Sequence, residues 1–430
     1  MHNAPAVDGD IASISQSLPA LLTAWCAEPE STPFPFAEVV GEYQRVGKHF
    51  VEPAVLDALG TARSRLKGIA GNAERQVLAT FLDVALDKRD ERYDYFSYLA
   101  LGLLPLPAGA DPFGLQRQRD RLLSLLVTDS LRFELGRYEG KPQPLPGMPP
   151  PAGVTAKRCR LGMRALAPSL RRLGLHGLRG DDDLVRARRV CEAVATLATD
   201  PELRAVRISM LPVYTLHDEY LFLRVLQAFE VSFAFIGQHL RAAIGALDAM
   251  EVEEAAARIR ACAVTLRESA PLFSLLASMQ VAAFRTFRTY TEGASAIQSG
   301  GYKLVESLCR RPATDRLDSV AYRSVEPVRQ EVLAGQRTVY EAFAEAAPQL
   351  GGSDLDQVTR AIGDFESAHG RWRQTHYRLA VRMLGGQSGT GYTEGTPYLK
   401  AGLELRLFPD LVPDRAGRPE SGIEPEEQFG

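Results

Sequence analysis

Apolar side chains recur at three- and four-residue spacing along almost the whole chain, and this periodicity limits the fold more than any other feature. Such spacing places the apolar residues on one face of a helix. Ala, Leu, Arg and Glu, which favour helices, are abundant. No segment requires the two-residue alternation of a strand. The sequence therefore predicts an all-α fold, and a length of 430 residues suits two or three domains.

One proline-rich stretch interrupts this pattern. Residues 140–153 read GKPQPLPGMPPPAG, and this density of proline excludes a helix and favours an extended linker. We therefore expect a helical N-terminal region over residues 1–139, a linker over 140–156 and a second helical domain over 157–430. The basic segment 157–189 is interpreted as the solvated face of a helix, because it carries no interleaved aromatic residues.

Four long helices are predicted in the second domain, over residues 220–250, 251–279, 319–347 and 354–384. Long helices around one core form a bundle, and bundle cores commonly hold flat cofactors. The segment 385–400 reads GGQSGTGYTEGTPYLK. Glycine lets a backbone approach a ligand closely, so this segment predicts a loop that closes over a site.

Composition excludes several classes of protein. The formal net charge is −3 and the sequence pI is about 6.2, without the basic excess of a nucleic-acid binder. No uninterrupted apolar run reaches the length of a membrane span, and the N-terminus lacks the pattern of a secretory signal. Five scattered cysteines form no CxxC pair, which argues against a zinc site and covalent heme attachment. We expect a cytoplasmic protein that binds neither nucleic acid nor membranes.

Among the seven histidines, His376 lies in the motif WRQTHYRLAVRMLGG near the end of the last long helix. A neutral imidazole on a rigid helix can serve as an axial ligand of heme iron. On its own, however, a single helical histidine is more often a packed or exposed side chain than a ligand.

Three blocks of sequence change this interpretation when they are considered together. They are LHDEYLF at 216–222, the pattern FR…SAIQS…YK…E at 287–306, and the stretch from Trp372 to Leu411 with GTGYTEG at 389–395 and FPDL at 408–411. In this order they resemble the signature of the tryptophan 2,3-dioxygenase family. The resemblance runs from His217 to Leu411, about half of the chain, and does not include the first 160 residues.

The resemblance implies a helical bundle that encloses heme b, and the helical periodicity adds a helical region at the N-terminus, outside the resemblance. It implies that His376 is the proximal ligand of the heme iron. Ser295 is expected near the heme edge or the oxygen pocket, and Gly389 in the loop beside the cofactor.

The resemblance also implies a binding site for an aromatic amino acid. Arg288 is expected to bind the substrate carboxylate, which a guanidinium can hold through two parallel hydrogen bonds. Thr390 is expected to bind the amino-acid end of the substrate when the glycine loop closes. Phe222 would form an apolar wall beside the indole.

The chain departs from the family pattern at Leu226 and in the glycine-rich loop, at Tyr392, Thr393 and Glu394. Leu226 stands where the dioxygenases have a distal histidine, and leucine can neither accept a hydrogen bond nor move a proton. Gln227 follows it, but a step of one residue turns a side chain by about 100° around the helix. Tyr392 adds bulk to the loop that would contact the substrate. No residue of this chain is therefore assigned as a catalytic acid or base.

The leading hypothesis is a dioxygenase that inserts both atoms of dioxygen into the indole C2–C3 bond of tryptophan or a substituted tryptophan, giving an N-formylkynurenine. A monooxygenase or a rearranging enzyme acting on a tryptophan-derived substrate is the first alternative. A non-catalytic heme-binding sensor is the second, and a helical scaffold without heme is the third. The family is usually tetrameric, so the resemblance implies a homo-oligomer.

Overall fold

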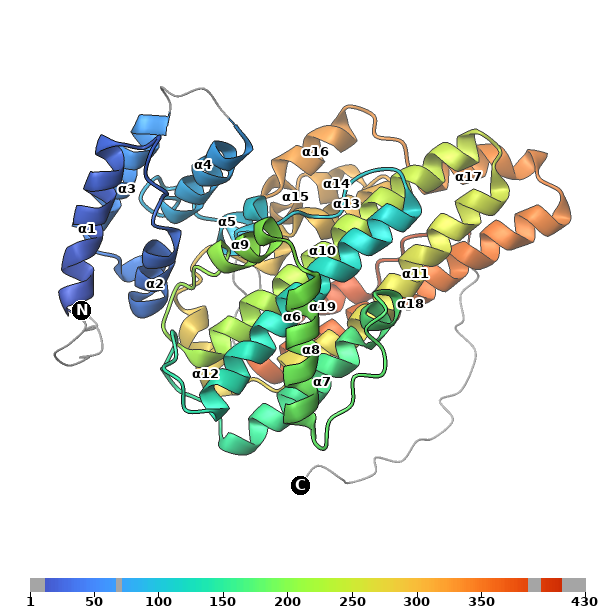
Figure 1. The fold of residues 1–430 in the computed structure, drawn as a ribbon. Helices are drawn as coiled ribbons and strands as arrows, with labels where there is room; N and C mark the ends of the chain where they lie inside the picture. Colours follow the sequence, from blue (N-terminus) through green and yellow to red (C-terminus); the bar gives the residue numbers. More distant parts are fainter. Residues whose placement is uncertain (1–11, 67–71, 386–395, 412–430) are drawn as a thin grey trace.

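The computed structural model describes residues 12–66, 72–385 and 396–411, and every regular element within these ranges is helical (Figure 1). The single β pairing in these ranges is an isolated parallel bridge between Gly147 and Leu216. The prediction of an all-α fold is confirmed.

The N-terminal helices form a unit with its own hydrophobic core, coloured blue in Figure 1. They are α1 (Ala12–Ala27), α2 (Phe36–Val46), α3 (Pro53–Leu66) and α4 (Ala73–Ala85). Leu22, Leu59 and Phe81 are fully buried at the centre of this unit. Ile208 and Leu211, from further along the chain, are buried in the same core, so the unit is packed onto the rest of the molecule.

Gly47 marks the junction between this unit and the rest of the molecule. Its φ of +84° lies in the left-handed region that favours glycine, and a Cβ at this position would lie 2.6 Å from the carbonyl oxygen of Val213. The next amide, that of Lys48, donates a hydrogen bond to the carbonyl of Pro212 at 2.8 Å. Only glycine permits this close contact.

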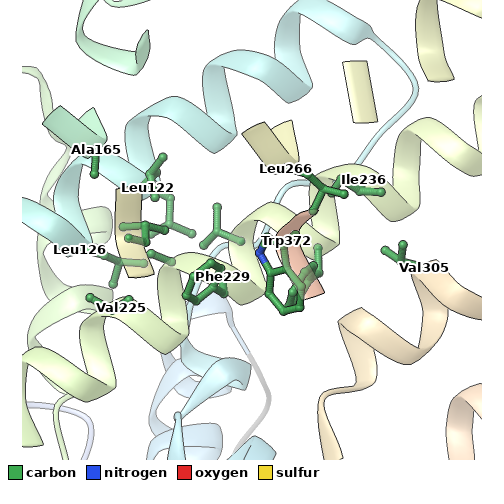
Figure 2. Close-up of a cluster of buried hydrophobic side chains, with 14 of the residues drawn as sticks. Leu122, Leu126, Ala165, Val225, Phe229, Ile236, Leu266, Val305 and Trp372 are labelled. Atoms are coloured by element: carbon green, nitrogen blue, oxygen red, sulfur yellow. The ribbon is translucent and has the colours of Figure 1, made fainter. Parts of the chain in front are cut away.

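The main bundle is built around α10 (His217–Asp248). The helix α11 (Val252–Leu276) packs against both α10 and α18 (Gly352–Leu384), while α6 (Pro112–Tyr138) packs on α10 and α7 (Ala152–Arg172) packs on α11. Figure 2 shows part of the shared core, with side chains contributed by α6, α7, α10, α11, α13 and α18: Leu122, Leu126, Ala165, Val225, Phe229, Ile236, Leu266, Val305 and Trp372.

Shorter helices close the bundle. They are α5 (Tyr95–Tyr98), α8 (Asp183–Leu197), α9 (Asp200–Ile208), α12 (Val281–Arg288), α13 (Gly300–Cys309), α14 (Thr314–Leu317), α15 (Val320–Arg323), α16 (Glu326–Leu333), α17 (Val339–Ala346) and α19 (Thr396–Leu403). The 3₁₀ helices are η1 (Lys48–Phe50), η2 (Leu101–Leu103), η3 (Ala296–Gln298) and η4 (Ala347–Gln349).

The prediction of one long helix over residues 319–347 is wrong. This segment folds into α15, α16 and α17 because three residues interrupt it. Pro327 lies in the first turn of α16, where its missing amide costs nothing. Gly335 has a φ of +91° after the end of that helix. Thr338 then caps α17 by accepting a hydrogen bond from the amide of Glu341.

The proline-rich segment lies against the start of α10. The amide of Gly147 donates to the carbonyl of Thr215 at 3.0 Å, and the amide of His217 donates to the carbonyl of Gly147 at 2.8 Å. The helix α7 begins at Ala152, and the main hydrophobic core contains residues from both sides of this segment. The domain division at 140–156 stays a prediction.

A fully buried ion network holds α6, α7 and α10 together. The guanidinium of Arg158 on α7 binds Glu134 of α6 at 2.5 Å and Asp218 of α10 at 2.6 Å. The other carboxylate oxygen of Asp218 accepts the amide of Gln280 at 2.6 Å, immediately before α12. The interpretation of the basic segment 157–189 as a solvated face is therefore wrong for Arg158.

Burial alone would raise the pKa of Glu134, but its hydrogen bond with His217 and the charge of Arg158 outweigh this effect and lower the pKa. Glu134 is therefore ionised at neutral pH, and the network depends on the cation of Arg158 to balance its carboxylates.

By length and composition, one helix in the described ranges, α10, could cross a bilayer. Most of its apolar window, 83%, is buried inside the protein. The core helix of a soluble protein has the same properties, so α10 is weak evidence for a membrane span.

We predict that Arg158→Met lowers the free energy of unfolding by about 3–5 kcal/mol, because it leaves the carboxylates of Glu134 and Asp218 buried without their cation. Urea denaturation followed by circular dichroism measures this loss. Arg160→Met, on the same helix, is the matched control. The side chain of Arg160 is 64% exposed and pairs with Asp183 at 3.3 Å, so its loss should cost less than about 1 kcal/mol. Equal losses in the two variants would contradict the importance of the network.

Candidate active site

A cavity of about 450 Å³ lies inside the main bundle, within the range typical of small-molecule sites. Its described wall comes from α10, α11, α12, α13 and α18, with additions from α5, α14, α19 and the segment between α12 and α13. Aromatic side chains dominate this wall: Tyr95, Tyr98, Phe222, Phe229, Phe233, Phe273, Phe284, Phe287, Tyr302 and Trp372. The cavity is therefore suited to a flat, largely apolar ligand.

One face of α10 forms an apolar side of the cavity. Phe222, Leu226, Phe229 and Phe233 follow one another at four-, three- and four-residue spacing, which places them on one face of the helix. None of these four side chains can accept a proton. Gln227 points elsewhere, as expected, because its amide donates to the backbone carbonyls of residues 99 and 209.

His376 reaches the cavity from α18. Its ring lies 6.0 Å from the ring of Phe273 and 5.4 Å from that of Trp372, between centroids. Burial lowers the pKa of His376 to about 4, with a further contribution from the charge of Arg373, so the imidazole is neutral at neutral pH. Among the described residues, neither ring nitrogen has a hydrogen-bond partner.

The residues present fit a heme. Within the part of the chain that the structure describes, no three His, Cys, Asp or Glu side chains gather into a metal-binding group. Heme iron does not need such a group, because the porphyrin supplies four nitrogens and one protein imidazole supplies an axial ligand. The neutral, half-buried imidazole of His376 can supply this axial ligand. The aromatic side chains around it offer flat surfaces on which a porphyrin can pack.

Trp372 lies one helical turn before His376 and faces α10. Its ring centroid lies 5.7 Å from that of Phe229 and 5.5 Å from that of Phe233, and Figure 2 shows it beside Phe229. These three rings connect α10 and α18, and both helices contribute to the wall of the cavity.

Arg288 is the last residue of α12 and lines the cavity with its side chain half-buried. Burial lowers its pKa, but a guanidinium remains charged at neutral pH. Ser295 lines the cavity after the end of this helix, where its amide donates to the side-chain oxygen of Gln298 at 3.2 Å. A cation at the end of α12 and a hydroxyl in the segment that follows it therefore both line the cavity.

The structure thus brings together five side chains predicted from the sequence, all on the wall of one cavity: Phe222, Leu226, Arg288, Ser295 and His376. Three other predicted positions lie outside the described residues, namely Gly389, Thr390 and Tyr392. The roles of all eight remain predictions.

Two tyrosines of the N-terminal region were not predicted as site residues. Tyr95 and Tyr98 of α5 line the cavity, and their hydroxyls donate to the buried carboxylates of Glu230 at 3.2 Å and Glu219 at 3.3 Å. The sequence feature that could have predicted these two residues is a capping box. Asp94 caps a short helix that carries two tyrosines three residues apart. Helical spacing of three places both rings on one face.

The acidic residues at the start of α10 do not cap this helix. Leu216 is the N-cap, and no side chain caps this helix. Glu219 instead accepts the amides of Val213 at 2.7 Å and Tyr214 at 3.0 Å, and burial raises its pKa to about 8. The carboxylate therefore fixes the chain that leads into α10.

Glu230 connects two sides of the cavity wall. Besides Tyr95, it accepts a hydrogen bond from the hydroxyl of Ser299 at 2.6 Å, and both partners line the cavity. Burial raises the pKa of Glu230 to about 7. This carboxyl group therefore joins α5 to the start of α13 behind the wall.

No profile of a known protein family matches the chain. Curated proteins named tryptophan 2,3-dioxygenase do match it. The protein from Bradyrhizobium sp. strain BTAi1 is 25% identical over 241 residues, 48% of this chain and 86% of the relative. The protein from Bordetella pertussis is 26% identical over 241 residues, 46% and 83%, and that from Pseudomonas aeruginosa PAO1 is 27% identical over 246 residues, 49% and 85%.

The chain is similar to tryptophan 2,3-dioxygenases over about half of its length. The matches cover most of each relative but only about half of this chain, so the chain carries additional helical structure outside the matched part. The resemblance inferred from the sequence motifs is confirmed.

We predict that Glu230→Gln changes the pH dependence of stability. The folded-state pKa of about 7 is raised, so the stability contributed by Glu230 is present below its unfolded value of 4.5 and is lost as the pH rises through 7. Across this window the wild type should lose about 3 kcal/mol that the variant does not lose. Urea denaturation at several pH values measures the difference. The exposed substitution Glu192→Gln should leave the wild-type profile unchanged, and parallel profiles for Glu230→Gln would contradict the prediction.

Proposed function

We propose that this protein is a heme-dependent oxygenase that acts on L-tryptophan or a substituted tryptophan, with 2,3-dioxygenation to an N-formylkynurenine as its reaction. The observation that carries the proposal is the position of His376 and Arg288 on the wall of one aromatic cavity. The names of the curated relatives support the same reaction.

Each side of the cavity has a distinct role in this proposal. His376 holds the heme b, which supplies the redox chemistry with dioxygen when it is bound. Arg288 binds the carboxylate of the amino acid and thereby fixes the orientation of the indole. Phe222 and Leu226 on α10 exclude water from the aromatic part of the substrate. Ser295 offers a hydroxyl at the edge of the same space.

The loop residues Gly389, Thr390 and Tyr392 complete the proposal as it follows from the resemblance. Thr390 binds the amino-acid end of the substrate, Tyr392 adds contact area, and Gly389 lies beside the cofactor. A cytoplasmic homo-oligomer remains a prediction.

One observation favours a second reaction. Leu226 shares the apolar face of α10 with three phenylalanines, so the described part of that face offers no base to receive the indole N–H. The absence of such a base leaves room for a monooxygenase or a rearranging enzyme on a tryptophan-derived substrate. The same cavity would bind either substrate class.

The experiment that tests the proposal combines a spectrum with product analysis. We expect the purified protein to take up hemin with a Soret band, which His376→Ala weakens or removes because it removes the axial ligand. With tryptophan and isotopically labelled dioxygen, we expect a formylkynurenine that carries two labelled oxygen atoms.

His369→Gln is the matched control on the same helix. His369 is buried beside Tyr302, with 2.9 Å between its Nε2 and the tyrosine hydroxyl, and does not line the cavity, so the variant should keep the Soret band. One labelled oxygen atom, or none, would support the second reaction. A Soret band without turnover would support a sensor, and no heme uptake would exclude all three.

We predict that Arg288→Met weakens tryptophan binding roughly ten- to a hundredfold, because a hydrogen bond to a charged group contributes about 1.5–3 kcal/mol. The heme content should be unchanged. Titration of the heme-loaded protein with tryptophan measures the dissociation constant. Tryptamine, which lacks the carboxylate, should bind the variant and the wild type equally. An equal loss for tryptophan and tryptamine would show that Arg288 does not recognise the carboxylate.

A further inference from the structure

The N-terminal unit contacts the segment that follows α12 through two of its side chains. The helix η1, which connects α2 to α3, carries His49, and the Nε2–H of this residue donates a hydrogen bond to the carbonyl of Tyr290. Lys88, shortly after α4, pairs with the carboxylate of Glu292. Both donors precede residues 216–411, where the family motifs lie. A region without an assigned role therefore holds a segment that contributes to the cavity.

The contacted segment forms part of the cavity wall. Arg288, Thr291 and Ser295 line the cavity, and Tyr290 lies between the first two in sequence. The hydroxyl of Thr291 donates to the carbonyl of Arg288 at 2.8 Å, and the amide of Tyr290 donates to the carbonyl of Phe287 at 2.8 Å. The turn is therefore joined to the end of α12, and a displacement of Tyr290 would move Arg288 with it.

This turn depends on contacts from outside. Glu292 has a φ of +47°, and a residue with a Cβ keeps such a left-handed backbone only where its surroundings hold it. The ring of Tyr290 stacks on that of Tyr214, with 4.2 Å between centroids and 5° between planes. Phe50 of η1 packs against both rings, at 5.6 Å from Tyr290 and 5.7 Å from Tyr214. The helix η1 therefore supplies apolar as well as polar support.

The helix η1 is itself held firmly. The ammonium of Lys48 binds the carboxylate of Asp87 at 2.7 Å and donates to the carbonyl of Val84 at 2.9 Å, and both charged side chains are buried. Lys88 follows Asp87 directly in the chain. One buried ion pair therefore positions both His49 and Lys88 relative to the turn.

The two polar contacts differ in strength. The side chains of Lys88 and Glu292 are 34% and 51% exposed, so solvent weakens their attraction. His49 is half-buried, and burial lowers its pKa more than the hydrogen bond to Tyr290 raises it. Its imidazole is therefore neutral at neutral pH and still donates through Nε2, because a carbonyl can only accept. His49 makes the stronger of the two contacts.

We propose that His49 is a positioning residue for substrate binding, which fixes the end of α12 through the carbonyl of Tyr290 so that Arg288 meets the carboxylate of the amino acid. His49 is not among the described residues that line the cavity, so it acts through the turn and not by contact with a ligand. This role rests on the proposed function. It assigns to the N-terminal unit a part in recognising the polar end of the substrate.

The test compares two ligands that differ in the carboxylate. Tryptophan and tryptamine are titrated into the heme-loaded, full-length protein, and binding is followed by the change of the Soret band. His49→Leu removes the donor and keeps most of the volume. We expect its dissociation constant for tryptophan to rise roughly three- to tenfold, as for the loss of one hydrogen bond. The constant for tryptamine and the heme content should not change.

His49→Gln is the conservative variant, because its side-chain amide can donate to the same carbonyl. It should restore most of the affinity for tryptophan. Lys88→Met removes the weaker contact from the exposed side, so it tests the same role without altering buried side chains. We expect it to raise the dissociation constant for tryptophan about twofold and to leave that for tryptamine unchanged.

Arg89→Met is the matched control. Arg89 follows Lys88, but its guanidinium binds Asp57 at 2.9 Å and the carbonyl of Leu56, both within the N-terminal unit. This variant should bind both ligands as the wild type does. An equal effect of Arg89→Met and His49→Leu would show a general loss of stability and would overturn the proposed role.

Other outcomes separate the positioning role from the proposed function. If His49→Leu binds tryptophan as tightly as the wild type, or weakens both ligands equally, His49 does not position Arg288, while the proposed function stands. Failure of His49→Gln to restore binding, or wild-type binding by Lys88→Met, would likewise contradict the role of this contact. If the wild type binds neither heme nor tryptophan, the proposed function fails and the positioning role fails with it.

Discussion

The buried guanidinium of Arg158 is the interaction on which the arrangement of the bundle depends. It connects α7 with Glu134 of α6 and Asp218 of α10, and Asp218 in turn holds the amide of Gln280 that precedes α12. The helix α12 ends at Arg288. A single cation therefore fixes the direction of the helix that carries the proposed substrate-binding residue, although it lies outside the cavity itself.

The chemistry of the cavity follows from two of the helices that form its wall. The α10 side is apolar, whereas α18 contributes the neutral imidazole of His376 and, one turn away, the charge of Arg373. Because of this asymmetry, α18 supplies the imidazole and the charged group that can bind a flat cofactor. An aromatic substrate can then pack against Phe222 on the other side.

Much of the fold and of the candidate site could be predicted from the sequence. The errors and omissions have physical causes. Helical periodicity predicts α10, α11 and α18, and the motifs predict His376 and Arg288. The prediction of a single helix over residues 319–347 was wrong because the local breaks at Gly335 and Thr338 outweigh the apolar periodicity. The burial of Arg158 depends on partners distant in sequence, which composition does not reveal. Tyr95 was missed for the same reason, since its carboxylate partner lies on another helix.

The tyrosines of α5 have a consequence for how the cavity forms. Tyr95 and Leu405 are far apart in the sequence, yet both line the same cavity. Closing a chain over such a separation costs entropy that only the complete core can offset. The cavity therefore needs both parts of the chain, and a fragment that began at α10 would lack the part of the wall that α5 contributes. Uptake of a coloured ligand would then act as a reporter for completion of the tertiary structure.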